Sequence, residues 1–129
     1  MNENEIAKTL VDVFYRIHVN FGPGLLESVY EELICYELKK IGWDFERQKE
    51  VKLQHDGKEL GIGFRADVIV MKKLIIEIKS VETLNPVHSK QLLTYLRLTN
   101  LQLGLLVNFN VPLIKNGINR IVNGLREAA

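Results

Sequence analysis

The sequence predicts an α+β fold in which a mixed central sheet of about four to six strands is flanked by helices. Two observations carry this expectation. Residues 3–41 have the pattern of a helical pair, and residues 43–122 combine short apolar strands with one further helix. The chain has 129 residues, of which 47% are hydrophobic, so we expect one domain over residues 1–129 with a buried core.

The N-terminal helical pair is indicated by apolar periodicity and by a break between the two helices. Over residues 3–20, apolar side chains recur at helical spacing, at Ile6, Leu10, Val13, Phe14, Ile17 and Phe21. Gly22-Pro23-Gly24 interrupts this pattern, and a second helix is expected over about residues 25–41. Gly42 suits the left-handed C-terminal cap of that second helix.

The middle of the chain is predicted to form antiparallel strands. Residues 43–55 are expected to form a strand that ends at the Asp56-Gly57 turn, with residues 58–62 as a short second arm. Residues 63–80, GFRADVIVMKKLIIEIKS, follow as a hairpin. A turn centred on Lys72 would pair Val70 with Leu74.

Strand alternation assigns each side chain of this hairpin to one face. In the first strand, one face is expected to carry Phe64, Ala66, Val68 and Val70, and the other Arg65, Asp67 and Ile69. In the second strand, one face carries Leu74, Ile76 and Ile78, and the other Ile75, Glu77 and Lys79. Asp67 then lies opposite Glu77, and a slip of one residue would send one strand's side chains to the wrong face.

The last third of the chain is predicted to add a helix and two strands. Asn85 and Pro86 have the residue types of an N-cap and a first helical position, and the helix should run to about Thr99. Residues 102–109 are apolar almost throughout, which indicates a strand buried on both faces. A final strand is expected over about residues 118–122.

The facing carboxylates of Asp67 and Glu77 suggest a metal site, because like charges opposite each other destabilise a strand pair unless a cation lies between them. Carboxylates suit Mg²⁺ or Mn²⁺, whereas zinc usually takes His or Cys ligands, and the chain has one cysteine and three scattered histidines. Lys79 shares the face of Glu77, where an ammonium can activate a water or stabilise transition-state charge. The alternative is a surface hairpin whose charged side chains are merely solvated.

The order of Asp67, Glu77 and Lys79 resembles the D…(D/E)-x-K signature of the PD-(D/E)XK nuclease superfamily. GLLESVY resembles the motif of a small bacterial and archaeal family named for Gly-x-x-Glu-x-x-Tyr, here Gly24, Glu27 and Tyr30. QLLTY resembles the Gln-x-x-x-Tyr motif of RecB-like and related exonucleases, here Gln91 and Tyr95. Together with the closing segment GLLVNFNVPLIKNGINRIV, the resemblance covers roughly residues 5–123. Ala66 stands where the superfamily's name has proline.

The resemblance implies a restriction-endonuclease-like core and hydrolysis of phosphodiester bonds with Mg²⁺ or Mn²⁺. Asp67, Glu77, Lys79 and Glu27 would be catalytic, and Asp67 and Glu77 would hold the metal. It also implies a metal role for Glu27, direct or through water, with Glu31 as the substitute. The structural alternative for Glu27 is a carboxylate that is favoured by the dipole at a helix start.

Three further residues are candidates for binding the substrate. Gln91 and Tyr95 lie on one face of the 86–99 helix and could contact a phosphate, a nucleobase or the catalytic carboxylates. The alternative is that they tie this helix to the sheet. Arg65 shares its strand face with Asp67, where it could contact phosphate or neutralise the carboxylate pair.

Two classes of function fit the sequence. The first is a nuclease that acts on nucleic acid, DNA in the first place, with low intrinsic sequence specificity. The second is a catalytically silent module that keeps the nuclease fold for interaction or assembly. The net charge of +1 argues against strong nucleic-acid binding, whereas the complete Asp, Glu and Lys set argues for catalysis.

The setting of the protein can also be predicted. No apolar run approaches the roughly 20 residues that span a bilayer, so no membrane association is expected. The polar N-terminus and the single cysteine favour a cytoplasmic location. A homodimer is compatible with nuclease function, because cutting both strands in one event needs two sites. A protein partner could supply sequence specificity.

Overall fold

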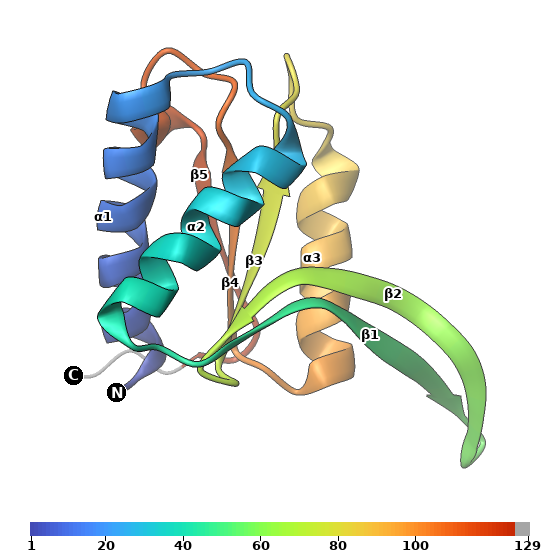
Figure 1. The fold of residues 1–129 in the computed structure, drawn as a ribbon. Helices are drawn as coiled ribbons and strands as arrows, with labels where there is room; N and C mark the ends of the chain where they lie inside the picture. Colours follow the sequence, from blue (N-terminus) through green and yellow to red (C-terminus); the bar gives the residue numbers. More distant parts are fainter. Residues whose placement is uncertain (126–129) are drawn as a thin grey trace.

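A computed structural model describes residues 1–125 and shows three α-helices packed on one five-stranded sheet (Figure 1). The helices are α1 (Glu3–Phe21), α2 (Glu27–Ile41) and α3 (Pro86–Thr99). The strands are β1 (Phe45–His55), β2 (Lys58–Val70), β3 (Leu74–Lys79), β4 (Leu103–Asn108) and β5 (Ile118–Val122), and a 3₁₀ helix spans Ile114–Asn116. This confirms the predicted α+β fold and its N-terminal helical pair. The single domain over residues 1–129 stays a prediction, and residues 126–129 lie outside the described part.

The sheet is mixed, and its strands lie in the order β1-β2-β3-β4-β5. Neighbouring strands are antiparallel except β3 and β4, which are parallel and joined through α3. Parallel neighbours need such a crossover, because a tight turn cannot connect them. β3 is the central strand of the sheet and β4 lies beside it. All six residues of β4 are buried, as the apolar run 102–109 predicted.

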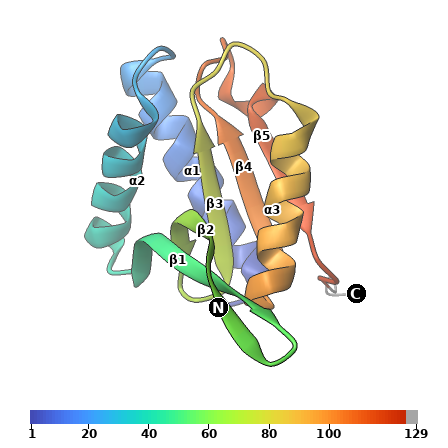
Figure 2. The ribbon, with the colours of Figure 1, turned by 90° about the vertical axis from the view of Figure 1, so that its right-hand side faces the viewer.

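Helices cover both faces of the sheet, with α1 and α2 on one side and α3 on the other (Figure 2). The larger core lies under α1 and α2 and includes Phe14, Tyr30, Ile34, Ile76, Leu105 and Phe109. The smaller core lies under α3 and includes Phe64, Ile75, Leu92, Leu96 and Leu106. The sheet lies between the two cores, so the side chains of its strands position both helical layers.

The caps predicted at the helix ends are present. Gly42 closes α2 with a left-handed backbone at φ 79°. The Asn85 side chain accepts a hydrogen bond from the Val87 amide, and Pro86 begins α3. Asn100 ends α3, also in a left-handed conformation. These local signals fix where each helix starts and stops.

The β2–β3 hairpin has the predicted register, with Val70 paired to Leu74 and Val68 paired to Ile76. Met71 and Lys72 in its turn both have positive φ, at 54° and 56°. Residues 58–62 do form an arm that pairs with β1 across the Asp56-Gly57 turn, but this arm is not a short strand of its own. β2 runs without interruption from Lys58 to Val70, because it pairs along its whole length with β1.

One prediction about the faces of β2 was also wrong. Val68 and Val70 pack into the larger core, but Phe64 and Ala66 pack under α3. In a regular strand all four would lie on the same face, because they occupy alternate positions. Figure 1 shows the reason, since β1 and β2 curve away from the sheet as a two-stranded ribbon. Two-stranded ribbons twist more strongly than wider sheets. The twist separates β2 from β3 at Asp67.

Candidate active site

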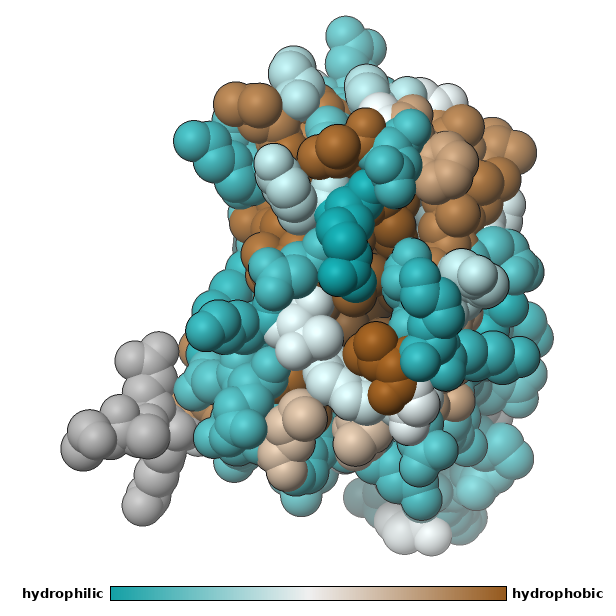
Figure 3. All heavy atoms as spheres, turned by 60° about the vertical axis from the view of Figure 1, so that its left-hand side comes forward, coloured by the Kyte–Doolittle hydropathy of each residue, from teal (hydrophilic) through white to brown (hydrophobic). Residues whose placement is uncertain are grey.

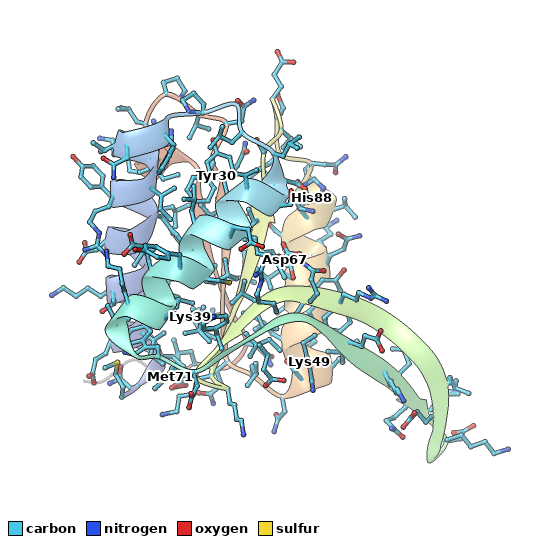
Figure 4. The ribbon with its side chains drawn as sticks, in the orientation of Figure 1. Tyr30, Lys39, Lys49, Asp67, Met71 and His88 are labelled. Carbon is cyan, nitrogen blue, oxygen red and sulfur yellow. The ribbon has the colours of Figure 1, made fainter. Side chains whose placement is uncertain are left out.

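The candidate site lies where β2 leaves β3, and it is built around Asp67 and Glu77. The last pair of the β2–β3 ladder is Val68 with Ile76, and Asp67 and Glu77 are the next residues along each strand. The Asp67 amide donates to the Glu77 carboxylate at 3.3 Å, and the Ile78 amide donates to the Asp67 carboxylate at 2.8 Å. Each strand therefore fixes the carboxylate of the other. In Figure 4, Asp67 lies between α2 and α3.

Both carboxylates are costly to ionise in this position. Burial and the neighbouring charge of Asp67 together raise the pKa of Glu77 to about 8, although the charge of Lys79 acts in the opposite direction. Burial also raises the pKa of Asp67, against hydrogen bonds from Ile78 and Gln48. A buried carboxylate beside a half-buried one, both with raised pKa values, has the electrostatics of a cation site or an acid–base site.

A pocket of about 350 Å³ opens beside Asp67, and we call it the carboxylate pocket. It is lined by Glu27, Ser28, Glu31, Gln48, Asp67, Ile78 and Lys79. Three of the predicted catalytic residues, Glu27, Asp67 and Lys79, thus line one pocket. Glu77 is hydrogen-bonded to the amide of Asp67, which is one of the lining residues. The pocket lies between the start of α2 and the point where the β1–β2 ribbon leaves the sheet.

Gln48 is a site residue that the sequence analysis did not identify. Its side-chain amide donates to Glu31 at 2.6 Å and to Asp67 at 3.3 Å, so it links α2 to the carboxylate pair. Its backbone has φ 49°, a left-handed conformation that is uncommon for a residue other than glycine. Strain of this kind often accompanies a functional position. A glutamine within a predicted strand gave no signal in the sequence.

The two α2 glutamates that line the carboxylate pocket have different surroundings. Glu27 is the first residue of α2, and it is exposed at the rim of the carboxylate pocket. Glu31 is 7% exposed, and its carboxylate is neutralised by Arg47 at 2.9 Å. Glu27 is therefore free to approach a ligand, whereas Glu31 is already bound by Arg47 and Gln48.

The three predicted substrate contacts lie outside the carboxylate pocket's lining. The Tyr95 ring stacks on Phe64 with centroids 3.6 Å apart, and burial and the charges of Glu77 and Asp67 raise its pKa. Gln91 is exposed one turn earlier on α3. Arg65 is exposed and pairs with Glu50 at 3.1 Å, so its hydrogen bond goes to β1 and not to the carboxylate pair.

The donor set fits a hard divalent cation such as Mg²⁺. Such a cation commonly binds one or two carboxylates and keeps several waters, and Asp67 and Glu77 supply two adjacent carboxylates. Within residues 1–125, no group of three or more His, Cys, Asp and Glu residues is placed to hold a metal. Glu27 is therefore not placed to bind directly beside the other two, and a contact through water suits its position.

The raised pKa of Glu77 predicts how the stability of the metal-free protein depends on pH. An unfolded chain ionises this group near 4.5, whereas the folded state keeps the proton up to about pH 8. The folded state therefore binds more protons over this range, so Glu77 makes the free energy of unfolding fall as the pH rises from 4.5 to about 8. Urea unfolding in EDTA, at steps between about pH 5 and pH 9, should show a weaker fall for Glu77→Gln.

A matched variant for this measurement is Glu82→Gln, which removes an exposed carboxylate close by in the sequence. Its pH dependence should follow that of the unaltered protein. Parallel curves for Glu77→Gln and the unaltered protein would show that Glu77 is not the responsible group.

The basic residues of the β1–β2 ribbon are largely neutralised within the protein. Arg47 pairs with Glu31 and Glu32, Lys49 with Glu46, and Lys52 with Glu59. Paired charges attract phosphates less strongly than free ones. The ribbon therefore offers no strongly basic track, in agreement with the near-neutral net charge. No helix in the described residues is long and apolar enough to cross a membrane.

A mixed sheet with helices on both faces and a carboxylate pair where two strands separate defines a restriction-endonuclease-like fold. The family model described as the PD-(D/E)XK nuclease superfamily matches residues 4–121, and the chain belongs to this superfamily. No curated protein and no solved structure matches the chain.

Proposed function

We propose that the protein is a metal-dependent nuclease of the Gly-x-x-Glu-x-x-Tyr branch, which hydrolyses phosphodiester bonds in nucleic acid, DNA in the first place. The observation that carries this proposal is the adjacent pair of half-buried Asp67 and buried Glu77 beside a pocket that Lys79 also lines. Burying two adjacent carboxylates is costly, and a bound cation would offset that cost. A silent module would have no need to retain this arrangement.

The proposed roles follow from the positions of the side chains. Asp67 and Glu77 would hold Mg²⁺ or Mn²⁺, and Glu27, at the pocket's rim, would act on the ion through water. When bound, the ion supplies Lewis-acid activation of water and neutralises charge on the phosphate. Lys79 faces the same space and stabilises the developing negative charge.

The substrate and its recognition follow from the surface around the site. Tyr95, Gln91 and Arg65 would contact the nucleic acid beyond the carboxylate pocket. The paired charges of the ribbon favour weak binding with low sequence specificity. A second copy of the chain would supply the second active site for cutting both strands, and a protein partner would supply added specificity.

Digestion assays test this proposal. Linear and circular DNA, single-stranded DNA and RNA would each be incubated with the purified protein in Mg²⁺, in Mn²⁺ and in EDTA. We expect metal-dependent cleavage of at least one DNA substrate, with none in EDTA, because the carboxylate pair needs a cation to bring a phosphate close. Failure to cleave any substrate with either metal would contradict the proposal.

A further inference from the structure

A second hollow adjoins the carboxylate pocket at the start of α2, and we call it the loop pocket. Its volume is about 560 Å³, and it is lined by Gly24, Leu25, Leu26, Glu27, Ser28, Ser80 and Asn110. Glu27 and Ser28 line both pockets. The two hollows therefore lie side by side at the start of α2, and a polymer bound at Asp67 and Lys79 would have the loop pocket next to it.

One wall of the loop pocket is fixed by Tyr30. Its hydroxyl donates to the Gly22 carbonyl at 2.6 Å and accepts from the Leu25 amide at 3.2 Å. Its ring is fully buried and stacks on Phe109 with centroids 4.2 Å apart. Ser80 adds a second anchor, since its hydroxyl donates to the Leu25 carbonyl at 2.6 Å. The loop before α2 is thus held in place without a ligand.

The opposite wall is fixed by Asn108, which is 3% exposed at the end of β4. Its side chain donates to the Val81 carbonyl at 2.9 Å and accepts from the amides of Val81 and Asn110. This ties the segment after β3 to the segment after β4. A hollow with both walls fixed loses little conformational entropy when a ligand binds.

The lining residues indicate what chemistry the loop pocket accepts. Among its described lining residues Glu27 carries the only charge, and a carboxylate repels phosphate. Leu26 is 72% exposed, so its side chain offers the pocket an apolar surface that a ligand can contact. Figure 3 shows that hydrophobic residues gather at the end of the molecule where α1 ends and α2 begins. Ser28 and Asn110 add hydrogen-bonding groups beside this apolar wall.

We infer that the loop pocket binds an unpaired nucleoside next to the scissile phosphate, which makes single-stranded nucleic acid or a frayed end the preferred substrate. An apolar wall with neutral hydrogen-bonding groups suits a base and its sugar, whereas a paired base is stacked in the duplex and cannot enter a pocket. The inference rests on the proposed nuclease function. It also gives Tyr30 and Gly24 a role in shaping the pocket.

The experiment uses single-stranded oligonucleotides that carry one abasic site at successive positions around the cleavage point. We expect one position beside the cut to lower kcat/KM by roughly ten-fold, because contact between a base and protein side chains is lost there. Abasic sites several nucleotides away should have little effect. Blunt duplexes of the same sequence should be cut more slowly than the single strand.

Leu26→Ala tests whether the loop pocket makes this contact. The variant should lower kcat/KM on the intact strand several-fold but have no further effect on the strand with the sensitive abasic site, as expected for two groups that contact each other. Leu113→Ala is the matched control, because Leu113 is also exposed, at 55%, and does not line the pocket. Binding of the same strands in EDTA, followed by fluorescence anisotropy, gives a second readout without cleavage.

The outcomes separate the pocket from the nuclease. Two results would overturn the assignment of the loop pocket as a nucleoside site without affecting the nuclease proposal. One is cleavage that no abasic position weakens, and the other is an equal effect of Leu26→Ala on the intact and the abasic strand. If no strand is cleaved, but the intact strand binds more tightly than the abasic strand and Leu26→Ala removes this difference, the nucleoside site is supported and the nuclease proposal is refuted. If there is neither cleavage nor tighter binding of the intact strand, both the nucleoside site and the nuclease proposal are overturned.

Discussion

Replacing Lys79 with alanine is expected to lower the rate of cleavage by a factor on the order of 10²–10³ and to leave metal binding intact. Lys79 lines the same pocket as Asp67, and its charge lowers the pKa of Glu77. An ammonium in this position stabilises the negative charge that develops on the phosphate. Its removal therefore raises the free energy of the transition state more than that of the bound substrate. Single-turnover cleavage with Mg²⁺ and with Mn²⁺ measures the effect.

Two further variants make this test specific. Lys8→Ala removes an exposed lysine from α1 and should cleave at the unaltered rate. Lys79→Arg keeps the charge in a larger group and should retain more activity than Lys79→Ala. If the unaltered protein and Lys79→Ala showed the same trace activity on every substrate, the nuclease proposal would fail. The alternative of a silent interaction module would then take its place.

Asp67→Asn is expected to abolish the stabilisation of the protein by Mg²⁺ or Mn²⁺. A ligand that binds only the folded state at about 100 times its Kd stabilises it by about 2.7 kcal/mol. For a domain of this size, that raises the Tm by roughly 10 °C. Asparagine removes one of the two adjacent carboxylates, and the remaining Glu77 should bind the ion too weakly to shift the Tm.

The metal-free stability of Asp67→Asn should change little. The two carboxylate oxygens of Asp67 accept hydrogen bonds from the Ile78 amide and from Gln48, and asparagine can keep only one of these acceptors. This loss is offset by removal of the like charge beside Glu77. Asp12→Asn, an exposed change on α1, is the matched control and should keep the full metal response. A metal-induced rise in Tm that survived in Asp67→Asn would rule out the proposed metal site.

The sequence by itself was sufficient for the features that depend on neighbouring residues. The apolar periodicity of α1, the Asn85-Pro86 start of α3 and the Gly42 cap each involve residues within a turn or two of one another. The pairing of Val70 with Leu74 follows from a short turn, and it brings Asp67 and Glu77 to adjacent positions. Local hydrogen bonds and strand alternation determine all of these features, so they can be predicted without a tertiary structure.

Only the tertiary structure decided how the site is completed. The twist of the β1–β2 ribbon turns Phe64 and Ala66 toward α3, which strict alternation cannot predict because pairing with a distant strand sets the twist. The bridge of Gln48 to Glu31 and Asp67 joins residues 17 and 19 positions apart, so it depends on how α2 packs against the ribbon. The position of the two pockets on either side of Glu27 likewise depends on packing, because residues near positions 27, 80 and 110 meet only after α2, β3 and β4 are assembled.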